Sequence, residues 1–437
     1  MPKMSKKFIA SIYLFNGCAV KSLTDNTVVC DDPILLAKNY SDSNVDEIIV
    51  FDKSPSGDDA AHEKALDIIK GICKAADVNV YGAGNVKRME DIKKLLYAGC
   101  KKACLNFSKE GNIEIISEVS EKFGKDKICI CFSDEKSVSD NKELVCKYAT
   151  ELFFITNDEN ALSDEFCKDF ENLRLTAVVD NYTSDDTPLN YLLENEKIDS
   201  ISGNILNDYI SKVIDYKDEC VSKNIPIERL EAKFNWESLK KNSDGMVPVI
   251  VQDYRTDQVL MLAYMNEEAY NKTLSTGKMT YFSRSRNELW IKGETSSHYQ
   301  YVYSLTADCD FDTILAKVRQ IGAACHTGSY SCFFNEIAKK DYTEKNPQKV
   351  LDSVFDVIQD RKVNPREGSY TNYLFDKGLD KILKKVGEEA TEMVIAAKNP
   401  DSNEIVYEMS DFLYHMMVLM AEKNVSWEDV TDELSRR

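Results

Sequence analysis

Short apolar runs alternate with amphipathic stretches throughout the first half of the chain. Runs rich in Ile, Val, Leu, Phe and Cys are typical of buried strands, and the stretches between them repeat apolar residues at helical spacing. The strand-like runs cover residues 8–15, 47–51, 78–81, 102–106, 127–132, 152–155, 175–179 and 198–201, and the helix-like stretches include residues 62–75 and 86–97. This alternation predicts a parallel α/β domain at residues 1–227, and its length fits a (β/α)8-like barrel.

The hydrophobic pattern changes after a polar linker at residues 224–244. Strand-like runs then surround one clear helical stretch, with strands at residues 247–251, 259–265, 279–283 and 299–305 and the helix at residues 266–275. Such a mixture predicts an α+β domain at residues 228–341. From residue 347 to residue 437 the apolar spacing is helical, which predicts a small all-α domain.

Length and charge narrow the possible functions. A chain of 437 residues with 43% hydrophobic and 30% charged residues is long enough for two or three domains. The formal net charge of -19 opposes general attraction to polyphosphate backbones, so nucleic acid is not an expected partner. Phosphorylated small molecules stay possible, because a basic pocket or bound metal ions can reverse the field at one site.

The start of the chain superficially copies a secretory signal, with lysines before an apolar run at residues 8–15. The run is short and stops at Asn16-Gly17, as a buried strand before a turn does. No apolar run approaches the ~20 residues that a membrane helix needs. The ten cysteines from Cys18 to Cys220 follow no metal-ligand or disulfide-domain spacing. We therefore expect a soluble cytoplasmic protein whose N-terminal thiols are reduced and mostly buried.

Three cysteines and three aspartates gather in one short stretch of the middle domain, namely Cys309, Cys325, Cys332, Asp308, Asp310 and Asp312. Thiolates favour zinc, and clustered carboxylates favour magnesium. If residues 308–312 are extended, alternation places the aspartates on one face and Cys309 on the other. Three thiolates leave a fourth zinc position open, which is typical of a catalytic site. The alternative interpretation is an acidic turn beside two buried thiols.

Two histidines accompany this stretch. His326 adjoins Cys325 and belongs to the residue type that titrates near neutral pH, so it is the preferred general acid or base. Its alternative roles are a fourth zinc ligand or a structural loop residue. His298 is either a substrate contact or a structural residue.

Two helix-like stretches near the end of the chain, residues 379–398 and 403–421, should form an antiparallel hairpin around a break at residues 399–401. Each helix carries two carboxylates three residues apart on one face: Glu389 with Glu392, and Glu408 with Asp411. All four should converge across the hairpin. Such convergence between apolar helices requires a cation, and magnesium suits a polyphosphate substrate. The alternative is a set of exposed charges on solvated helix faces.

Several motifs follow one another through the middle domain: Tyr-Phe-Ser-Arg-Ser-Arg at 281–286, Leu-Trp-Ile-Lys-Gly-Glu-Thr-Ser at 289–296, Asp-Cys-Asp at 308–310, Cys-His-Thr-Gly at 325–328 and Ser-Cys at 331–332. In this order they resemble phosphoribosyl-AMP cyclohydrolase. The resemblance implies a zinc-dependent hydrolysis that opens the adenine ring at its N1–C6 bond. It implies zinc at the three cysteines, magnesium at the three aspartates, and a homodimer with zinc sites across its interface. The candidate substrate-binding residues are Arg284, Arg286, Lys292 and His298.

Two positions depart from the cyclohydrolase pattern. Phe311 stands where a glycine is common, and Ser297 replaces the glycine of a Ser-Gly-His run. A side chain at either position could crowd the backbone near phosphate or metal. Since neither change removes a ligand, we expect altered affinity rather than lost activity.

The stretch from Gly378 to Lys398, together with residues 408–415, resembles phosphoribosyl-ATP pyrophosphohydrolase. That family belongs to the all-α nucleotide pyrophosphohydrolases with paired Glu-x-x-Glu and Glu-x-x-Asp motifs, and both motifs are intact here. The resemblance implies magnesium-dependent hydrolysis of phosphoribosyl-ATP to phosphoribosyl-AMP and pyrophosphate. Glu388 is a candidate supporting residue. The candidate phosphate-binding residues are Lys377, Lys381, Lys384 and Lys385, although a lysine-bearing helix surface is ordinary.

Residues 12–20 and 81–86 resemble the phosphoribosyl-isomerase barrels of the same pathway. Those enzymes use one aspartate at the end of the first strand and another half a barrel later. Here Tyr13 takes the first place, and residues 128–132 contain no aspartate. Loss of both carboxylates removes the proton-transfer groups, so we expect a non-catalytic barrel that is a scaffold or an effector-binding module. Gly82 and Gly84 could admit a phosphate to backbone amides, or could be ordinary barrel turns.

The two hydrolase resemblances together predict a bifunctional enzyme of histidine biosynthesis. It would convert phosphoribosyl-ATP to phosphoribosyl-AMP and then open the adenine ring to the imidazolecarboxamide ribotide, with zinc and magnesium as cofactors and phosphoribosyl nucleotides as its small-molecule partners. Two alternatives belong to other classes: a zinc-stabilised interaction protein, and a regulatory sensor whose barrel binds a pathway metabolite.

Overall fold

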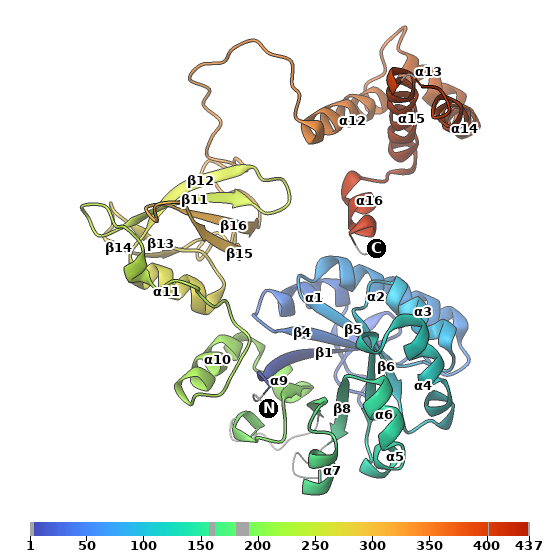
Figure 1. Ribbon diagram of the computed structural model, residues 1–437, viewed down its shortest axis with the longest axis vertical. Helices are drawn as coiled ribbons and strands as arrows, with labels where there is room; N and C mark the ends of the chain where they lie inside the picture. The colour runs from blue at the N-terminus through green and yellow to red at the C-terminus, as the bar shows by residue number, and fades with distance from the viewer. Residues whose placement is uncertain (1–3, 157–161, 181–191, 401, 436–437) are drawn as a thin grey trace. The chain divides into compact units, whose positions relative to one another are not determined.

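The computed structural model describes residues 4–156, 162–180, 192–400 and 402–435. It divides into two compact units, residues 1–335 and 336–437 (Figure 1). Within the first unit, the N-terminal and middle parts of the chain have separate hydrophobic cores. Residue 401, which belongs to the predicted break between the C-terminal helices, lies outside the described residues. The predicted boundary between residues 227 and 228 stays a prediction.

The N-terminal part is a closed barrel of parallel strands, as predicted. The strands are β1 (Lys7–Phe15), β4 (Glu47–Asp52), β5 (Asn79–Ala83), β6 (Lys102–Asn106), β7 (Ile128–Phe132), β8 (Glu151–Thr156), β9 (Arg174–Val179) and β10 (Ser200–Ser202). They pair in chain order, and β10 pairs with β1 to close the barrel. An additional hairpin that the apolar pattern did not indicate, formed by β2 (Cys18–Val20) and β3 (Val28–Cys30), extends antiparallel from β1.

Helices surround the strands (Figure 1). They are α1 (Pro33–Ser41), α2 (Asp59–Ala75), α3 (Met89–Tyr97), α4 (Glu110–Phe123), α5 (Glu135–Ser139), α6 (Lys142–Tyr148), α7 (Asp164–Asp169), α9 (Asn204–Asn207) and α10 (Val213–Ser222). Alternate residues of β1 enter different cores: Ile12 and Leu14 pack outward against the helices, while Ile9 and Tyr13 fill the barrel interior. Because both faces are buried, the strands are apolar throughout rather than alternating.

The thiols of the barrel differ from expectation. Cys104 of β6 and Cys129 of β7 are register partners on neighbouring strands and form a disulfide, so the expectation of reduced thiols is wrong for this pair. Both residues belong to the interior core, where neighbouring parallel strands bring their side chains together. Half of the ten cysteines, rather than most of them, are buried: Cys100, Cys104, Cys129, Cys131 and Cys220.

The middle part combines a four-stranded sheet with a two-stranded one. The large sheet has the order β12-β11-β16-β15, and β13 pairs with β14. The elements are β11 (Val247–Asp253), β12 (Val259–Met265), α11 (Glu267–Thr276), β13 (Thr280–Ser283), β14 (Glu288–Ile291), β15 (Gln300–Ala307) and β16 (Ile314–Gln320). Strand β16 was not predicted from the sequence. It buries Ile314, Ala316 and Val318, while charged residues on its other face interrupt the apolar run.

The second unit is all-α, as predicted. Its helices are α12 (Pro347–Val363), α13 (Tyr370–Lys377), α14 (Leu379–Ala396), α15 (Ser402–Lys423) and α16 (Trp427–Leu434). Helices α14 and α15 correspond to the predicted hairpin and pack against each other. No helix among the described residues is long and apolar enough to cross a membrane. The cytoplasmic location stays a prediction.

Candidate metal-binding active sites

The three aspartates of the middle domain lie on the turn between β15 and β16. Ala307 pairs with Ile314, so residues 308–313 form the connection, and the expectation of an extended segment is wrong. The carboxylate of Asp308 accepts hydrogen bonds from the backbone N–H groups of Asp312 at 3.0 Å and Thr313 at 3.2 Å. These bonds tighten the turn and bring one oxygen of each aspartate within 4.8 Å of the others. An exposed set of three carboxylates fits a magnesium ion, which keeps several waters.

The hydrogen bonds also affect ionisation. Desolvation by itself would raise the pKa of the Asp308 carboxyl group. The hydrogen bonds from the backbone N–H groups of Thr313 and Asp312 outweigh desolvation, so the pKa of Asp308 is lowered. The carboxyl group is therefore held in the charged form that binds a cation.

The two departures from glycine have a common backbone explanation. Phe311 has φ 65° and Ser297 has φ 58°, in the left-handed region that glycine adopts without steric cost. The ring of Phe311 packs edge-on against Phe234 of the polar linker, with ring centroids 5.2 Å apart. The backbone N–H of Lys240 donates to the carbonyl oxygen of Phe311 at 2.7 Å. The side chain at this departure is therefore directed toward the linker.

Two of the three predicted zinc ligands lie side by side. Cys325 and Cys332 follow β16, and the backbone N–H of Cys332 donates to the carbonyl of Leu260 in β12 at 2.7 Å. The hydroxyl of Thr327 donates to Cys325 Sγ at 3.1 Å and, with backbone N–H donors and the neighbouring Cys332 thiol, lowers the pKa of Cys325. A thiol that ionises readily is a suitable metal ligand.

Cys309 stands apart from that pair. It is exposed on the acidic turn, where its nearest polar contact is Asp310 at 4.0 Å. Among the residues that the structure describes, no group of three metal-binding side chains includes a cysteine. One chain therefore presents two thiols at one place and a third at another.

Lys292 and His298 flank the thiol pair. Lys292 is buried, and its ammonium donates to the carbonyl oxygen of His298 at 3.3 Å. Burial lowers the pKa of Lys292, although the nearby Cys332 and Cys325 thiolates oppose this shift. The ring of His298 lies against Gly322, where a Cβ atom would come within 2.6 Å of it. Glycine is thus required where the segment leading to Cys325 begins.

The other candidates of this domain are more exposed. His326 is exposed, with Nδ1 3.9 Å from Cys325 Sγ. Arg284 and Arg286 lie on the turn between β13 and β14. The guanidinium of Arg284 stacks 3.9 Å from the ring centroid of Tyr264, and Arg286 pairs with Glu288 at 3.2 Å.

The helical hairpin brings its predicted carboxylates together. One oxygen each of Glu389, Glu408 and Asp411 lies within 4.8 Å of the others. Glu392 is exposed and outside this tight group, although its charge acts on Glu408. Desolvation, followed by the charges of Glu392, Glu389 and Asp411, raises the pKa of Glu408. A donor set of oxygens that repel one another fits a divalent cation.

Lysines compensate part of this charge. Lys385 pairs with Glu389 at 3.2 Å and with Glu388 at 3.0 Å. Lys384 is exposed and pairs with Glu388 at 3.3 Å. Lys377 lies 5.9 Å from the ring centroid of Tyr373, and Lys381 is half-buried on α14. Of the four predicted lysines, only Lys385 contacts a member of the tight carboxylate group in the described structure.

Sequence reasoning missed His415, which is buried beside these carboxylates. Its Nδ1 lies 2.8 Å from the carbonyl oxygen of Asp411 and 3.7 Å from Glu389 Oε1. Its Nε2 lies 3.1 Å from the hydroxyl of Tyr370 on α13. The spacing of 408, 411 and 415 along one helix could have revealed the histidine. No sequence pattern near Tyr370 indicates its contact with His415, because the two residues are 45 positions apart in the chain.

At the carboxyl ends of the barrel strands, a cavity of about 100 Å³ lies among residues such as Asp52, Gly84 and Asn106. Tyr13 donates a hydrogen bond to Asp180, the residue after β9, and stacks on Phe51 with ring centroids 5.3 Å apart. Burial raises the pKa of Asp180. Close packing explains why glycine stands at both candidate phosphate contacts. A Cβ atom at Gly82 would lie 2.8 Å from Leu95, and a Cβ atom at Gly84 would lie 2.1 Å from a backbone oxygen.

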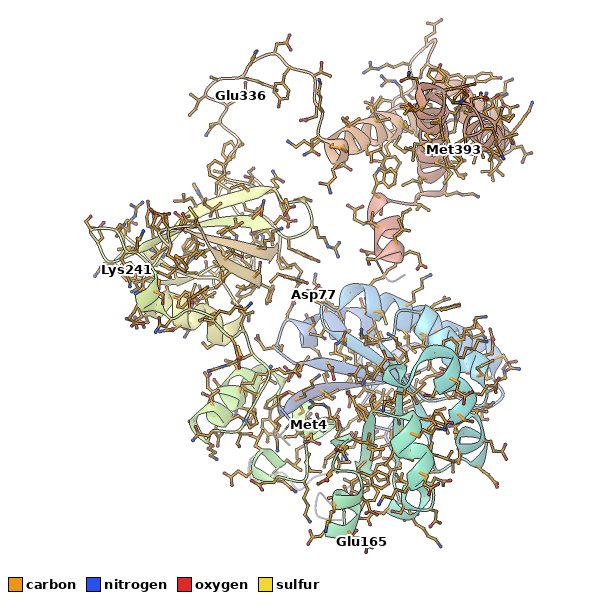
Figure 2. All side chains as sticks on the ribbon, viewed as in Figure 1. Met4, Asp77, Glu165, Lys241, Glu336 and Met393 are labelled. Carbon is orange, nitrogen blue, oxygen red and sulfur yellow. A yellow bond between two sulfur atoms is a disulfide. The ribbon has the colours of Figure 1, made fainter. Side chains whose placement is uncertain are left out.

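Figure 2 draws the side chains of the described residues as sticks and labels Met393 of α14. Three family models match successive parts of the chain. Histidine biosynthesis protein matches residues 7–179, Phosphoribosyl-AMP cyclohydrolase residues 261–334, and Phosphoribosyl-ATP pyrophosphohydrolase residues 351–437. The barrel, the sheet domain with its acidic turn and the helical hairpin therefore define a bifunctional hydrolase of histidine biosynthesis.

Relatives carry both hydrolase parts under one name, histidine biosynthesis bifunctional protein HisIE. The chain is 54% identical over 208 residues to that of Thermoanaerobacter pseudethanolicus, covering 45% of this chain and 96% of the relative. It is 50% identical over 192 residues to that of Lactococcus lactis, covering 44% and 88%, and 48% identical over 201 residues to that of Bacillus subtilis, covering 46% and 95%. The chain belongs to the HisIE family, with phosphoribosyl-ATP pyrophosphohydrolase and phosphoribosyl-AMP cyclohydrolase activities.

Proposed function

We propose that the α14–α15 hairpin hydrolyses phosphoribosyl-ATP with bound magnesium. The observation that carries this proposal is the group of Glu389, Glu408 and Asp411, whose oxygens lie within 4.8 Å of one another. Magnesium, when bound there, would neutralise the phosphates and stabilise negative charge that develops on them. Water adds to phosphorus as the bond between the α- and β-phosphates breaks, and pyrophosphate leaves.

The surrounding residues have distinct tasks in this proposal. Lys385 holds Glu389 and Glu388 in place through ion pairs of 3.2 and 3.0 Å. Glu392, exposed at the edge of the group, would supply a fourth carboxylate for the cation. Lys377, Lys381 and Lys384 contribute positive charge around the entering phosphates.

The middle domain then opens the adenine ring of phosphoribosyl-AMP by adding water across the N1–C6 bond. Zinc, when bound by thiolates, would supply the Lewis acid that activates this water. His326 is exposed beside Cys325, where it can accept and return the proton. Lys292 is held against the same thiols, and the acidic turn binds magnesium for the substrate phosphate. Arg284, Arg286 and His298 are the remaining substrate contacts.

The third zinc ligand comes from a second copy of the chain. Cys325 and Cys332 adjoin each other, while Cys309 is exposed on the acidic turn. An isologous dimer can join the turn of one copy to the thiol pair of the other and form two equivalent sites. This arrangement explains why one chain contains the ligands without assembling them.

The barrel at residues 1–227 is non-catalytic in this proposal. Tyr13 and Asp180 bind each other at its mouth, so the position of the isomerase acid is filled by an aromatic side chain. A role as a sensor remains the second candidate function for this domain alone. The remaining domains are residues 228–341 for ring opening and 347–437 for pyrophosphate release.

The test supplies the full-length protein with phosphoribosyl-ATP, zinc and magnesium. We expect pyrophosphate release followed by the ring-opened imidazolecarboxamide product, and both should stop after treatment with a chelator. Phosphoribosyl-AMP supplied directly should be converted when pyrophosphate release is blocked. Conversion of neither nucleotide, with zinc fully bound, would instead support a zinc-stabilised interaction protein.

A further inference from the structure

Helix α13 presents two exposed aromatic rings next to the acidic group of the hairpin. The exposed fractions of Tyr370 and Tyr373 are 46% and 43%, whereas Thr371, Asn372 and Leu374 of the same helix are buried. The two rings are nearly parallel, with planes 22° apart and centroids separated by 6.2 Å. One side of this short helix therefore presents two nearly parallel, exposed aromatic rings.

Contacts connect this surface to the proposed magnesium ligands. The hydroxyl of Tyr370 lies 3.1 Å from Nε2 of His415, and the two rings meet edge to face at 5.9 Å. Nδ1 of His415 lies 3.7 Å from Glu389 Oε1. Since His415 is buried, Tyr370 is held beside the carboxylates by a side chain with little freedom to move, and Tyr373 stacks on Tyr370.

The substrate has a part that matches such a surface. If the carboxylates hold the triphosphate through magnesium, as proposed above, the adenine base extends away from them and needs a flat partner. Aromatic side chains stack on nucleobases regardless of their hydrogen-bonding edges. The adenine of phosphoribosyl-ATP is substituted at N1, which makes the base an amidine that binds a proton more readily than the adenine of ATP does.

A protonated, flat base is attracted to the faces of tyrosine rings more strongly than a neutral one is. We propose that Tyr370 and Tyr373 form the platform for the N1-substituted adenine and make the hairpin select phosphoribosyl-ATP over ATP. This inference rests on the proposed function of the carboxylates and adds the basis of its specificity.

The experiment measures KM and kcat for phosphoribosyl-ATP and the inhibition constant of ATP, using the full-length protein. Tyr373→Leu should raise KM for phosphoribosyl-ATP about tenfold, because it removes both stacking and the attraction of the protonated base to the ring face. Inhibition by ATP should weaken less, because its neutral adenine loses the stacking alone. Tyr373→Phe keeps the ring and should retain the wild-type ratio of the two constants. Tyr342→Leu removes a more exposed tyrosine, 61% exposed in the segment before α12, and should change neither constant.

Three results would overturn the platform. One is an unchanged KM in Tyr373→Leu, and another is an equal loss of affinity for both nucleotides. The third is a change of oligomeric state in Tyr373→Leu without a change in the ratio of KM for phosphoribosyl-ATP to the inhibition constant of ATP. That result would show that the two tyrosine rings form a contact between subunits. If Tyr373→Leu fails to fold, Tyr373→Trp decides, because a larger aromatic face should preserve discrimination. Absence of pyrophosphate release by the wild-type protein would contradict the proposed function instead.

Discussion

Single residues mark where this chain differs from the families that its parts resemble. Tyr13 occupies the place of an isomerase aspartate, and the structure gives it a partner, Asp180, that no local pattern indicated. Phe311 and Ser297 occupy places where glycine is common, and both adopt the left-handed conformation that favours glycine. The departures were readable in the sequence, but the contacts that accommodate them were not, because their partners come from distant segments.

The Tyr13–Asp180 pair should stabilise the barrel. Tyr13→Phe keeps the ring that stacks on Phe51 but leaves the Asp180 carboxylate without its hydroxyl donor. We expect a loss of roughly 1.5–3 kcal/mol in the free energy of unfolding, the range for hydrogen bonds to charged groups. Urea unfolding monitored by circular dichroism measures it. Asp180→Asn is the control, since an amide oxygen still accepts from Tyr13 and the loss should be smaller. Equal stability of Tyr13→Phe and wild type would contradict this account.

At Phe311, backbone strain and packing oppose each other. Phe311→Ala removes the contact with Phe234 and retains an unfavourable left-handed Cβ, whereas Phe311→Gly removes both. We therefore expect the glycine variant to be more stable than the alanine variant by roughly 1 kcal/mol. Urea unfolding followed by tryptophan fluorescence is suitable, because Trp236 and Trp290 belong to this domain. Greater stability of the alanine variant would show that the turn relaxes out of the left-handed region.

At the scale of elements, the helical hairpin was predictable and the acidic turn was only partly so. Residues three apart share a helix face, so two short motifs and a central break suffice to predict facing carboxylates. The aspartates of the middle domain were argued to share one face if residues 308–312 are extended, yet they converge because the chain turns between β15 and β16. Strand β16 itself escaped prediction because charged residues on its other face interrupt the apolar run along the chain.

The hairpin prediction is tested by Asp411→Asn. The change preserves size and removes one negative charge from the group that we propose to hold magnesium. Pyrophosphate release from phosphoribosyl-ATP should fall by a factor of about 100 or more, since positioning of a catalytic metal is lost. Fold stability should change little, because one fewer charge relieves repulsion in the absence of the cation.

Ring opening of supplied phosphoribosyl-AMP is the internal control for Asp411→Asn. The cyclohydrolase candidates belong to the other compact unit, residues 1–335, so this reaction should continue at the wild-type rate. Equal loss of both reactions would indicate misfolding or a shared site. Retention of both would mean that the carboxylates are only a charged helix surface.

At the scale of the whole molecule, the zinc site raises the question of how many chains complete it. Cys309→Ser and Cys325→Ser should each lose zinc and ring opening, because a hydroxyl does not replace a thiolate ligand. When the two variants are unfolded and refolded together, half of the dimers formed are mixed. Each mixed dimer has one site with all of its cysteines, so about a quarter of wild-type activity should return.

Separately refolded variants, mixed afterwards without exchange, provide the matched control and should stay inactive. Zinc content should rise in parallel with activity in the co-refolded sample. If the three cysteines instead bound zinc within one chain, every chain in the mixture would lack a ligand. Activity would then not return, and the dimeric site would be refuted.

The sequence by itself determined the kinds of element, their order, and the chemistry that each part contains. Hydrophobic spacing predicted a barrel, a mixed domain and a helical domain, because a short stretch of sequence already shows the apolar period of two residues for a strand or 3.6 residues for a helix. It also placed Glu389 and Asp411 on facing helices. Only the tertiary structure decided which distant side chains meet: Cys104 with Cys129, Tyr13 with Asp180, and Tyr370 with His415. These contacts depend on the packing of whole elements, which fixes distances that no local spacing specifies.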